Sequence, residues 1–520
     1  MCADTPEYKD TLNLPRTDFP MRAGLPKREP EWLARWEEIG VYDRLREKQG
    51  RTPFTLHDGP PYANGHLHIG HALNKTIKDM IVRSHQMMGF DARYIPGWDC
   101  HGLPIEWKIE EQYRKKGRDK DQVPINEFRG ECREFARGWV DIQREEFKRL
   151  GITGNWENPY LTMDFHAERV IAEEFMKFLM NGTLYQGSKP VMWSPVEKTA
   201  LAEAEVEYHD KESFTVWVKF RVVGTGGDLD GAKVVIWTTT PWTMPSNKAV
   251  VYGAGISYGL YEVTATPDEC WAEVGERFVL SDALAADVMG RARLEEGMYT
   301  RVRDVTQDEL AKASLEHPLK GAEGAGGEWD DLRDFRAADF VTDTEGTGFV
   351  HCAPSHGLEE YELYRDLGML EQVITYNVME DGRFRDDLPF FGGKAILKPN
   401  GKEGNANSAI IDKLVEVGGL LARGKIKHSY PHSWRSKAPV IYRNTPQWFA
   451  AIDKPVGDGL DTFGKTIRER ALTEIDNVNW TPKSGRNRLH SMMEARPDWV
   501  LSRQRAWGVP LTCFTKKGAL

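Results

Sequence analysis

The 520-residue sequence has few cysteines, no long apolar run and no excess of positive charge. Its six cysteines are scattered and form no Cys-x-x-Cys pair, which argues against a disulfide framework and a thiolate zinc site. No apolar stretch reaches the roughly 20 residues of a membrane-spanning helix. The N-terminus lacks the basic and hydrophobic regions of a signal peptide. We therefore expect a cytoplasmic protein without a membrane partner and without a metal site in this portion.

The charge balance also restricts the class of partner. The formal net charge is -10, so general binding to nucleic acid is not expected and any RNA contact must come from local patches. The basic run from Arg114 to Arg118 is one such patch, although a solvated loop explains it equally well. With 40% hydrophobic and 11% aromatic residues, the composition is that of a globular protein with roughly two to four domains.

A turn rich in proline and glycine separates a short predicted strand, residues 54–56, from a predicted helix. His68 and His71 lie at the start of that helix, on either side of Ile69 and Gly70. Unpaired N–H groups and the helix dipole attract phosphate at such an end, and two imidazoles add further donors. Apolar residues then recur three or four positions apart and predict a stripe that packs on a sheet. They are Ile69, Leu73, Ile77, Met80, Ile81 and Met87.

A second block follows some thirty residues later and reads Gly-Trp-Asp-Cys-His-Gly-Leu-Pro-Ile-Glu, from Gly97 to Glu106. Its Asp99 sits at the end of a predicted neighbouring strand. A carboxylate there can accept a charge-assisted hydrogen bond from an ammonium group. An ordinary turn-capping aspartate is the alternative.

These two blocks resemble the signature of class I aminoacyl-tRNA synthetases, and Ala72–Lys75 with Trp98–Glu106 resemble the isoleucine-specific branch. The resemblance implies a Rossmann-like parallel sheet interrupted by a large, mostly β editing insertion. It also implies ligation of isoleucine to its tRNA through an isoleucyl-adenylate, with ATP and Mg²⁺ as substrate. The full-length protein would be a monomer whose partners are isoleucine, ATP and the isoleucine-accepting tRNA.

The same resemblance assigns roles to individual residues. Pro60 would line the amino-acid pocket, and Asp99 would accept a hydrogen bond from the α-ammonium of the substrate. His68, Gly70 and His71 would bind ATP, with both histidines acting on the phosphates during catalysis.

A second constellation lies in a stretch of short β-like runs and glycine clusters. It combines the threonines Thr238, Thr239 and Thr240 with His351 and Glu360, and resembles the editing site of isoleucine, valine and leucine synthetases. A hydrophobic pocket rejects a substrate lacking one methylene by only ~1 to 3 kcal/mol, a limit for which the isoleucine enzyme is itself the usual example. The resemblance therefore implies hydrolytic editing of valyl-tRNA, although threonines are also common in ordinary strands. Glu360 stands where the family pattern has aspartate, so we expect editing with altered geometry.

We expect four regions along the chain. Residues 1–50 form a leader with one amphipathic helix over 28–46, and residues 51–204 form the first half of the Rossmann-like catalytic domain. Residues 205–425 form the editing insertion, and residues 426–520 begin the second catalytic half. No Lys-Met-Ser-Lys-Ser loop and no anticodon-binding helical domain occur in these residues, so we expect an incomplete form that is inactive in aminoacylation. The alternative is an editing-only or noncatalytic fragment that binds aminoacyl-tRNA.

Overall fold

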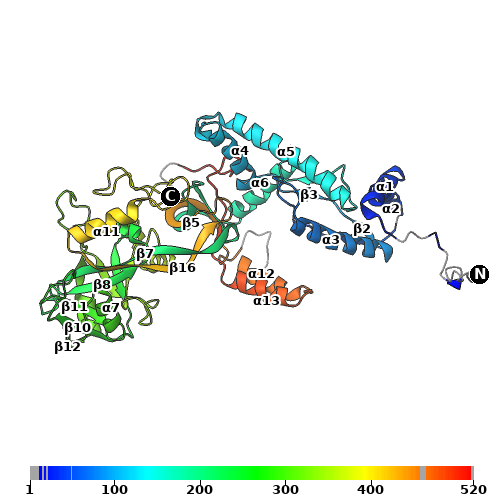
Figure 1. Cartoon of the computed structure of the whole chain (residues 1–520). Helices are drawn as coiled ribbons and strands as arrows, with labels where there is room; N and C mark the ends of the chain where they lie inside the picture. Colours follow the sequence, from blue (N-terminus) through cyan, green and yellow to red (C-terminus); the bar gives the residue numbers. More distant parts are fainter. Residues whose placement is uncertain (1–10, 14–16, 19–21, 49, 457–463, 517–520) are drawn as a thin grey trace, which may run out of the picture. The chain divides into compact units, whose positions relative to one another are not determined.

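The computed structural model describes residues 11–13, 17–18, 22–48, 50–456 and 464–516 (Figure 1). Contacts divide the chain into two compact units: unit 1 is Met1–Ile171 with Ala506–Val509, and unit 2 is Ala172–Arg505 with Pro510–Leu520. The division at residue 171 differs from the boundary expected after residue 204. Residues 172–204 belong to unit 2, where strand β5 (Leu184–Ser194) pairs from Leu184 to Trp193 with β17 (Ile441–Ala450).

The expected leader helix over 28–46 is two helices. Helix α1 runs from Leu25 to Glu38 and α2 from Val41 to Arg46. Gly40 lies between them with a φ of 58°, a left-handed conformation that ends the first helix and that glycine adopts without steric cost.

Unit 1 is mixed α/β and contains short parallel strand pairs. Strand β1 (Pro53–Thr55) pairs with β2 (Asp91–Arg93), and β3 (Gly97–Trp98) pairs with β4 (Tyr160–Leu161). Unit 1 also contains the helices α3 (Ile69–Met87), α4 (Leu103–Lys115) and α5 (Ile125–Arg149), with a short 3-10 turn at Lys120–Gln122. Helix α6 (Phe165–Met180) begins in unit 1 and continues into unit 2. The core of unit 1 includes the fully buried Trp98, Ile105 and Cys132.

Helix α3 does not bury the apolar stripe that its sequence pattern predicts. The stripe is exposed, from 37% at Ile81 to 85% at Ile69 and 88% at Met87. The buried residues of α3 are Lys75, Val82 and Gln86. The prediction was wrong because unit 1 offers this helix polar partners, and buried polar groups are stable where they are hydrogen-bonded.

Unit 2 contains the β-rich insertion expected from the sequence. Its largest sheet has the order β12-β10-β11-β8-β7-β13, and β16 also pairs with β7. A three-stranded sheet has the order β14-β9-β15, and a four-stranded sheet has the order β18-β17-β5-β6. The strands are β6 (Thr199–Ala200), β7 (Val206–Val223), β8 (Lys233–Thr238), β9 (Ala249–Tyr252), β10 (Tyr258–Val263), β11 (Arg277–Ser281), β12 (Tyr299–Val305), β13 (Ser314–Glu316), β14 (Asp334–Ala337), β15 (Phe349–Cys352), β16 (Leu420–Ser433) and β18 (Trp499–Val500).

Helices and short 3-10 turns connect the strands of unit 2. The helices are α7 (Ala285–Arg291), α8 (Gln307–Lys312), α9 (Leu358–Asp366), α10 (Leu370–Val373), α11 (Ala406–Glu416), α12 (Ile467–Asn477) and α13 (Ser484–Glu494), and the turns are Glu203–Glu205 and Pro241–Ser246. The long antiparallel pair β7 and β16 frames the insertion. Its first strand begins at Val206, and its last strand runs to Ser433 because the pairing continues beyond residue 425. Across the described residues of both units, no helix combines the length and hydropathy needed to cross a bilayer.

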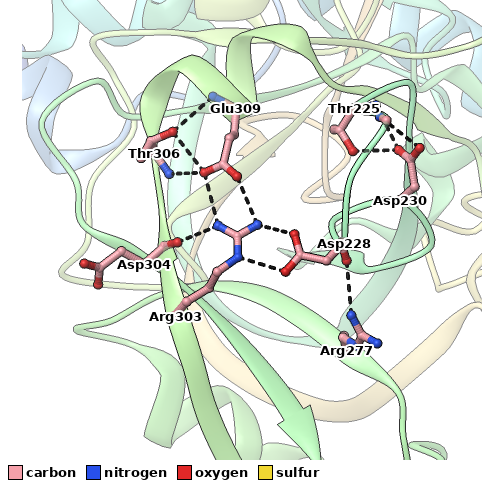
Figure 2. A network of polar contacts seen from close by, with 9 residues as sticks. Thr225, Asp228, Asp230, Arg277, Arg303, Asp304, Thr306 and Glu309 are labelled. Atoms are coloured by element: carbon pink, nitrogen blue, oxygen red, sulfur yellow. Dashed lines mark hydrogen bonds and ion pairs between the residues drawn. The ribbon is translucent and has the colours of Figure 1, made fainter.

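A surface network in unit 2 ties a glycine-rich loop to β12 and α8 (Figure 2). The Arg303 guanidinium forms ion pairs with Asp228, in the loop, and with Glu309, in the first turn of α8. Glu309 also accepts hydrogen bonds from the backbone N–H and the hydroxyl of Thr306, the N-cap of that helix. Because one cation bridges two carboxylates from different segments, the network fixes the loop more firmly than an isolated surface pair would.

We expect Arg303→Ala to lower the free energy of unfolding of unit 2 by about 1 kcal/mol, since it removes both ion pairs of a network. Urea unfolding of the 520-residue chain, followed by a probe in unit 2, measures the change. Arg293→Ala is the matched control, because Arg293 is 64% exposed and forms one pair with Glu269 at 3.4 Å. Equal losses for the two variants would contradict the bridging role.

Candidate functional site

The structure brings the proline-rich turn and Asp99 together. The backbone N–H of Asp99 donates to the Pro61 carbonyl at 2.9 Å, and the N–H of Ala63 donates to the Asp99 carbonyl at 3.0 Å. A Cβ on Gly97 would meet the Tyr160 ring at 3.1 Å and would lie at van der Waals distance, 3.5 Å, from the Pro60 Cβ. Pro60 and Asp99, assigned to one pocket from the sequence, therefore lie on adjacent strand-like segments.

His68 and His71 form a reciprocal cap at the start of α3. The Nδ1 atom of His68 accepts from the Gly70 N–H at 3.1 Å, and the Nδ1 atom of His71 accepts from the His68 N–H at 3.3 Å. The two rings stack with centroids 3.8 Å apart. The cap satisfies two of the N–H groups that the first turn of a helix leaves without partners.

This cap fixes the tautomer of both neutral imidazoles. Because each Nδ1 accepts a hydrogen bond, the ring proton lies on Nε2. Burial lowers the pKa of His71, and the neighbouring His68 lowers it further, while Glu146 opposes the shift. Two Nε2–H donors thus stand at the positive end of a helix, an arrangement that suits a phosphate group.

Two residues of α5 that the sequence analysis missed hold the loop before α3. Glu146 accepts from the Leu67 N–H at 2.9 Å and contacts the His66 ring. Burial alone would raise the pKa of Glu146, but the hydrogen bonds from His66 and Leu67 hold it below its ordinary value. Gln143 donates to the carbonyls of Tyr62 and Gly65. The spacing of three between Gln143 and Glu146 on one amphipathic helix was the only sequence feature that pointed to a shared role.

An open cavity of about 580 Å³ lies between the start of α3 and the end of α5. His68 and Ile69 contribute one wall and Glu146 the other. Its remaining lining residues are Leu67, Ala72, Glu145, Arg149 and Leu150. The cavity is large enough for a phosphate-bearing ligand, within the usual range for small-molecule sites.

The Asp99 carboxylate is largely withdrawn from water. Its Oδ1 accepts from the His101 N–H at 3.2 Å. Burial raises the pKa of Asp99, while hydrogen bonds from the His101 backbone and the Thr162 side chain oppose that shift. A desolvated carboxylate gains more from an ammonium partner than an exposed one does, because the surrounding dielectric is lower.

A buried ion-pair cluster lies beneath the turn and was also missed from the sequence. Asp58, whose side chain is 4% exposed, contacts both the Lys75 and the Lys78 ammonium groups of α3. It also accepts from the Tyr94 hydroxyl at 2.8 Å. Burial lowers the pKa of Lys75, and the Lys78 charge adds to that shift. The cluster fixes the residue just before the proline turn to the helix that carries both histidines.

In unit 2, the threonine segment and the histidine segment face one another across a cavity of about 170 Å³. Thr238 and Thr240 line it from the end of β8, with their hydroxyls 3.2 Å apart. His351 on β15 and Glu360 on α9 line the other side. The remaining lining residues are Trp237, Thr243, Val350, Ala353, His356 and Gly357.

Thr239 is not part of this cavity. Its neighbours in a separate small hollow include Lys211, Asn407 and Tyr430. Alternation along an extended segment turns successive side chains to opposite sides, so Thr238 and Thr240 share the side that faces the cavity, although Thr240 also lines the hollow of Thr239. The sequence analysis grouped the three threonines because it did not apply that alternation.

His351 is buried, and both of its nitrogens are hydrogen-bonded. Its Nδ1 accepts from the Asn247 amide at 2.9 Å, so its Nε2–H donates to the Thr243 hydroxyl at 2.8 Å. Burial lowers the pKa of His351 to about 4, and the nearby His356 contributes to the shift. The ring is therefore neutral near pH 7 and serves to position its neighbours.

Glu360 folds back over the start of α9. Its carboxylate occupies the space that a Cβ on Gly357 would take. Burial raises the pKa of Glu360 to about 7, and the adjacent Glu359 charge contributes to the rise. The carboxyl group is thus poised between its two protonation states near neutral pH.

Among the residues that the structure describes, no three His, Cys, Asp or Glu side chains gather as a metal site would require. Of the six cysteines, Cys2 lies outside the described residues. The structure shows no disulfide bond among the other five.

Comparison with known proteins gives concordant matches. The family model for class I tRNA synthetases (I, L, M and V) matches residues 31–519. The isoleucine–tRNA ligase of Ruegeria pomeroyi is 80% identical over 525 residues, which cover 100% of this chain and 54% of that protein. The isoleucine–tRNA ligase of Brucella abortus is 55% identical over 524 residues, which cover 98% of this chain and 53% of that protein.

A solved ternary complex of an Agrobacterium radiobacter LeuRS with tRNA and LeuAMS aligns with 81% of this chain and 49% of its own. The TM-score is 0.32 and the identity is 17%. The chain spans about half the length of the curated relatives it matches.

We expect Lys75→Met to lower the free energy of unfolding of unit 1 by about 3 kcal/mol, because it removes a buried charge from its carboxylate partner. Lys78→Met is the matched control: it contacts the same Asp58, but its side chain is 23% exposed against 5% for Lys75. We expect a loss of about 1 kcal/mol or less for the control. Denaturant unfolding followed in unit 1 measures both, and a larger loss for Lys78→Met would contradict the assignment.

Proposed function

The chain belongs to the class I tRNA synthetases (I, L, M and V), and we propose that its full-length protein ligates isoleucine to tRNA through an isoleucyl-adenylate. The observation that carries the proposal is the cap at the start of α3, which presents two Nε2–H donors beside the turn that pairs with Asp99. Class I synthetases act in tRNA aminoacylation. What we propose beyond this is that the amino acid is isoleucine and that the residues described below bind it. The cytoplasmic location and the monomeric state are further parts of this proposal.

In the proposed activation step, the isoleucine carboxylate attacks the α-phosphorus of ATP and pyrophosphate leaves. His68 and His71 donate from Nε2 to the phosphate oxygens, and the N–H groups near Gly70 add the positive end of the helix. Mg²⁺ enters bound to ATP and offsets the charge of the phosphates. The histidines need no proton transfer for this role, because their donors already point away from the capped backbone.

The amino acid would be held at its other end by Asp99 and Pro60. The Asp99 carboxylate accepts a charge-assisted hydrogen bond from the α-ammonium, and this bond favours a free amino acid over one acylated on nitrogen. Pro60 lies on the neighbouring turn and supplies apolar surface to the side chain. The resulting adenylate then passes its acyl group to the terminal ribose of the tRNA.

We also propose that unit 2 hydrolyses valyl-tRNA. Glu360 would bind the α-ammonium of the misplaced amino acid, while Thr238 and Thr240 orient the ribose or the attacking water. His351 would act by holding Thr243 in place. Thr239, which lines a different hollow, takes no direct part in this version of the site.

An editing-only activity is the second candidate for the 520 residues taken alone. One observation favours it: all lining residues of the editing cavity fall between Trp237 and Glu360, within unit 2. Hydrolysis of valyl-tRNA without isoleucine-dependent pyrophosphate exchange would support this candidate. Both assays apply to the 520-residue chain and to a polypeptide of the relatives' length.

We expect Asp99→Asn, in a polypeptide of the relatives' length, to reduce kcat/KM for isoleucine in pyrophosphate exchange by about 100-fold, the scale of one charge-assisted bond. Asp141→Asn is the control, because Asp141 is 61% exposed on α5, where it pairs with Arg144. We expect the control to retain full activity. Absence of exchange in the unaltered protein would refute the proposed activation, and full activity of Asp99→Asn would refute the role of Asp99.

We expect hydrolysis of valyl-tRNA to rise with pH through about 7. Burial raises the pKa of Glu360 from its ordinary value of 4.5 to about 7, so the carboxylate that binds an ammonium is lost as pH falls through that value. The histidines of the cavity do not interfere, because the pKa of His351 and that of His356 are both lowered to about 4.

Glu360→Gln should abolish the pH step near 7 and slow hydrolysis about tenfold or more, as expected for loss of one charged partner. Glu360→Asp tests the geometry, since it restores the shorter residue of the family pattern. Glu362→Gln, on the same helix and 49% exposed beside Arg365, is the control and should leave the profile unchanged. A pH profile of Glu360→Gln that matches the unaltered protein would contradict the assignment.

A further inference from the structure

A segment from the far end of the sequence packs onto the loop that follows Asp99. Residues Ala506–Val509 belong to unit 1, although some 400 positions separate them from this loop. The Gly102 N–H donates to the Trp507 carbonyl at 3.1 Å. Gly102 itself has a φ of 77°, so the loop needs glycine at the point of contact.

The central group in this contact is the carboxylate of Glu106, in the first turn of α4. Its side chain is 0% exposed. One oxygen, Oε2, accepts from the backbone N–H of Ala506 and from that of Trp507, both at 3.0 Å. The Lys120 ammonium lies 3.8 Å from the other oxygen. A buried carboxylate is tolerated when N–H donors and a cation compensate it in this way.

Trp507 continues the contact toward Asp99. Its indole N–H donates to the carbonyl of Cys100, the residue after Asp99, at 2.6 Å. The ring is 2% exposed, and the His101 ring meets it edge-on with centroids 5.0 Å apart. The segment 506–507, whose N–H groups are bound by Glu106, therefore holds the loop from Asp99 to Gly102 in place.

We propose that Glu106 is a positioning residue for amino-acid binding. By fixing the backbone at Ala506 and Trp507, it holds the indole against Cys100 and so sets the direction of the Asp99 carboxylate. This inference rests on the proposed function for its catalytic consequence. We call the contact of Glu106 with the N–H groups of Ala506 and Trp507 the clamp. Its presence can be tested independently of the proposed function.

The clamp should act on isoleucine more than on ATP. Asp99 is the proposed ligand of the α-ammonium, whereas the proposed phosphate donors His68 and His71 are fixed by their own cap on α3. Loosening the segment at Ala506 and Trp507 therefore displaces the amino-acid end of the site. The Nε2–H donors keep their positions.

Hydrogen exchange on the 520-residue chain tests the clamp without any assay of activity. In Glu106→Gln, we expect the amides of Ala506 and Trp507 to exchange about tenfold faster or more, because each loses a charged acceptor. Glu106→Asp, which keeps the charge on a shorter side chain, should fall between. Glu110→Gln is the control, one turn further along α4, where the carboxylate pairs with Arg114 at 2.5 Å.

Exchange in α5 reports whether unit 1 remains folded, so a general loss of structure is separated from a local release. If Glu106→Gln fails to fold, Glu106→Asp is the variant to test. The amides of Ala506 and Trp507 must then exchange faster in Glu106→Asp than in the control Glu110→Gln. Unchanged protection of Ala506 and Trp507 in the folded variants would overturn the clamp.

Kinetics on a polypeptide of the relatives' length test the consequence. We expect Glu106→Gln to raise KM for isoleucine about tenfold in pyrophosphate exchange and to leave KM for ATP within about twofold. Equal changes in both constants would overturn the positioning role even if the clamp is present. If the unaltered polypeptide shows no exchange, the proposed function fails, while the hydrogen-exchange result still decides the clamp.

Discussion

Two backbone hydrogen bonds between the proline turn and Asp99 hold the proposed catalytic site together. They run from Asp99 N–H to the Pro61 carbonyl and from Ala63 N–H to the Asp99 carbonyl. Because backbone groups make them, the side chain of Asp99 stays available for a ligand. The turn that leads into the histidine cap is thereby fixed to the strand end that carries the carboxylate. The Asp99 side chain can still change direction without moving the histidines, because their own cap on α3 fixes them.

A polar foundation supports that geometry. Asp58 joins the start of the proline turn to Lys75 of α3, and Glu146 of α5 holds the loop before the two histidines. Such groups cost free energy when buried alone, yet a satisfied network restricts the arrangements available to a loop. Shape in this site therefore depends on paired charges more than on apolar packing, which is why α3 turns Lys75 inward.

The sequence predicted the motifs well and their surroundings less well. His68 and Asp99 were found from local patterns, because helix starts and strand ends carry recognisable residues. The side on which α3 is buried was not predicted from the sequence. Periodicity shows which side of a helix is apolar, but it does not show which segment packs against the helix. The contact between Glu106 and Trp507 has no local signal at all, because it joins segments some 400 residues apart. Thr239 was misassigned for a simpler reason, the alternation of side chains in an extended segment.

The two proposed sites apply the same physical device to different ends. Burial raises the pKa of both Asp99 and Glu360, and an ammonium ligand would stabilise the charged form of each. The α-ammonium is free both in the amino acid and in its ester with tRNA, so recognition of that cation cannot distinguish isoleucine from valine. Discrimination must then come from the space around the side chain, where one methylene is worth little in a single pocket. Two pockets that read the same cation but exclude different side chains resolve this limit.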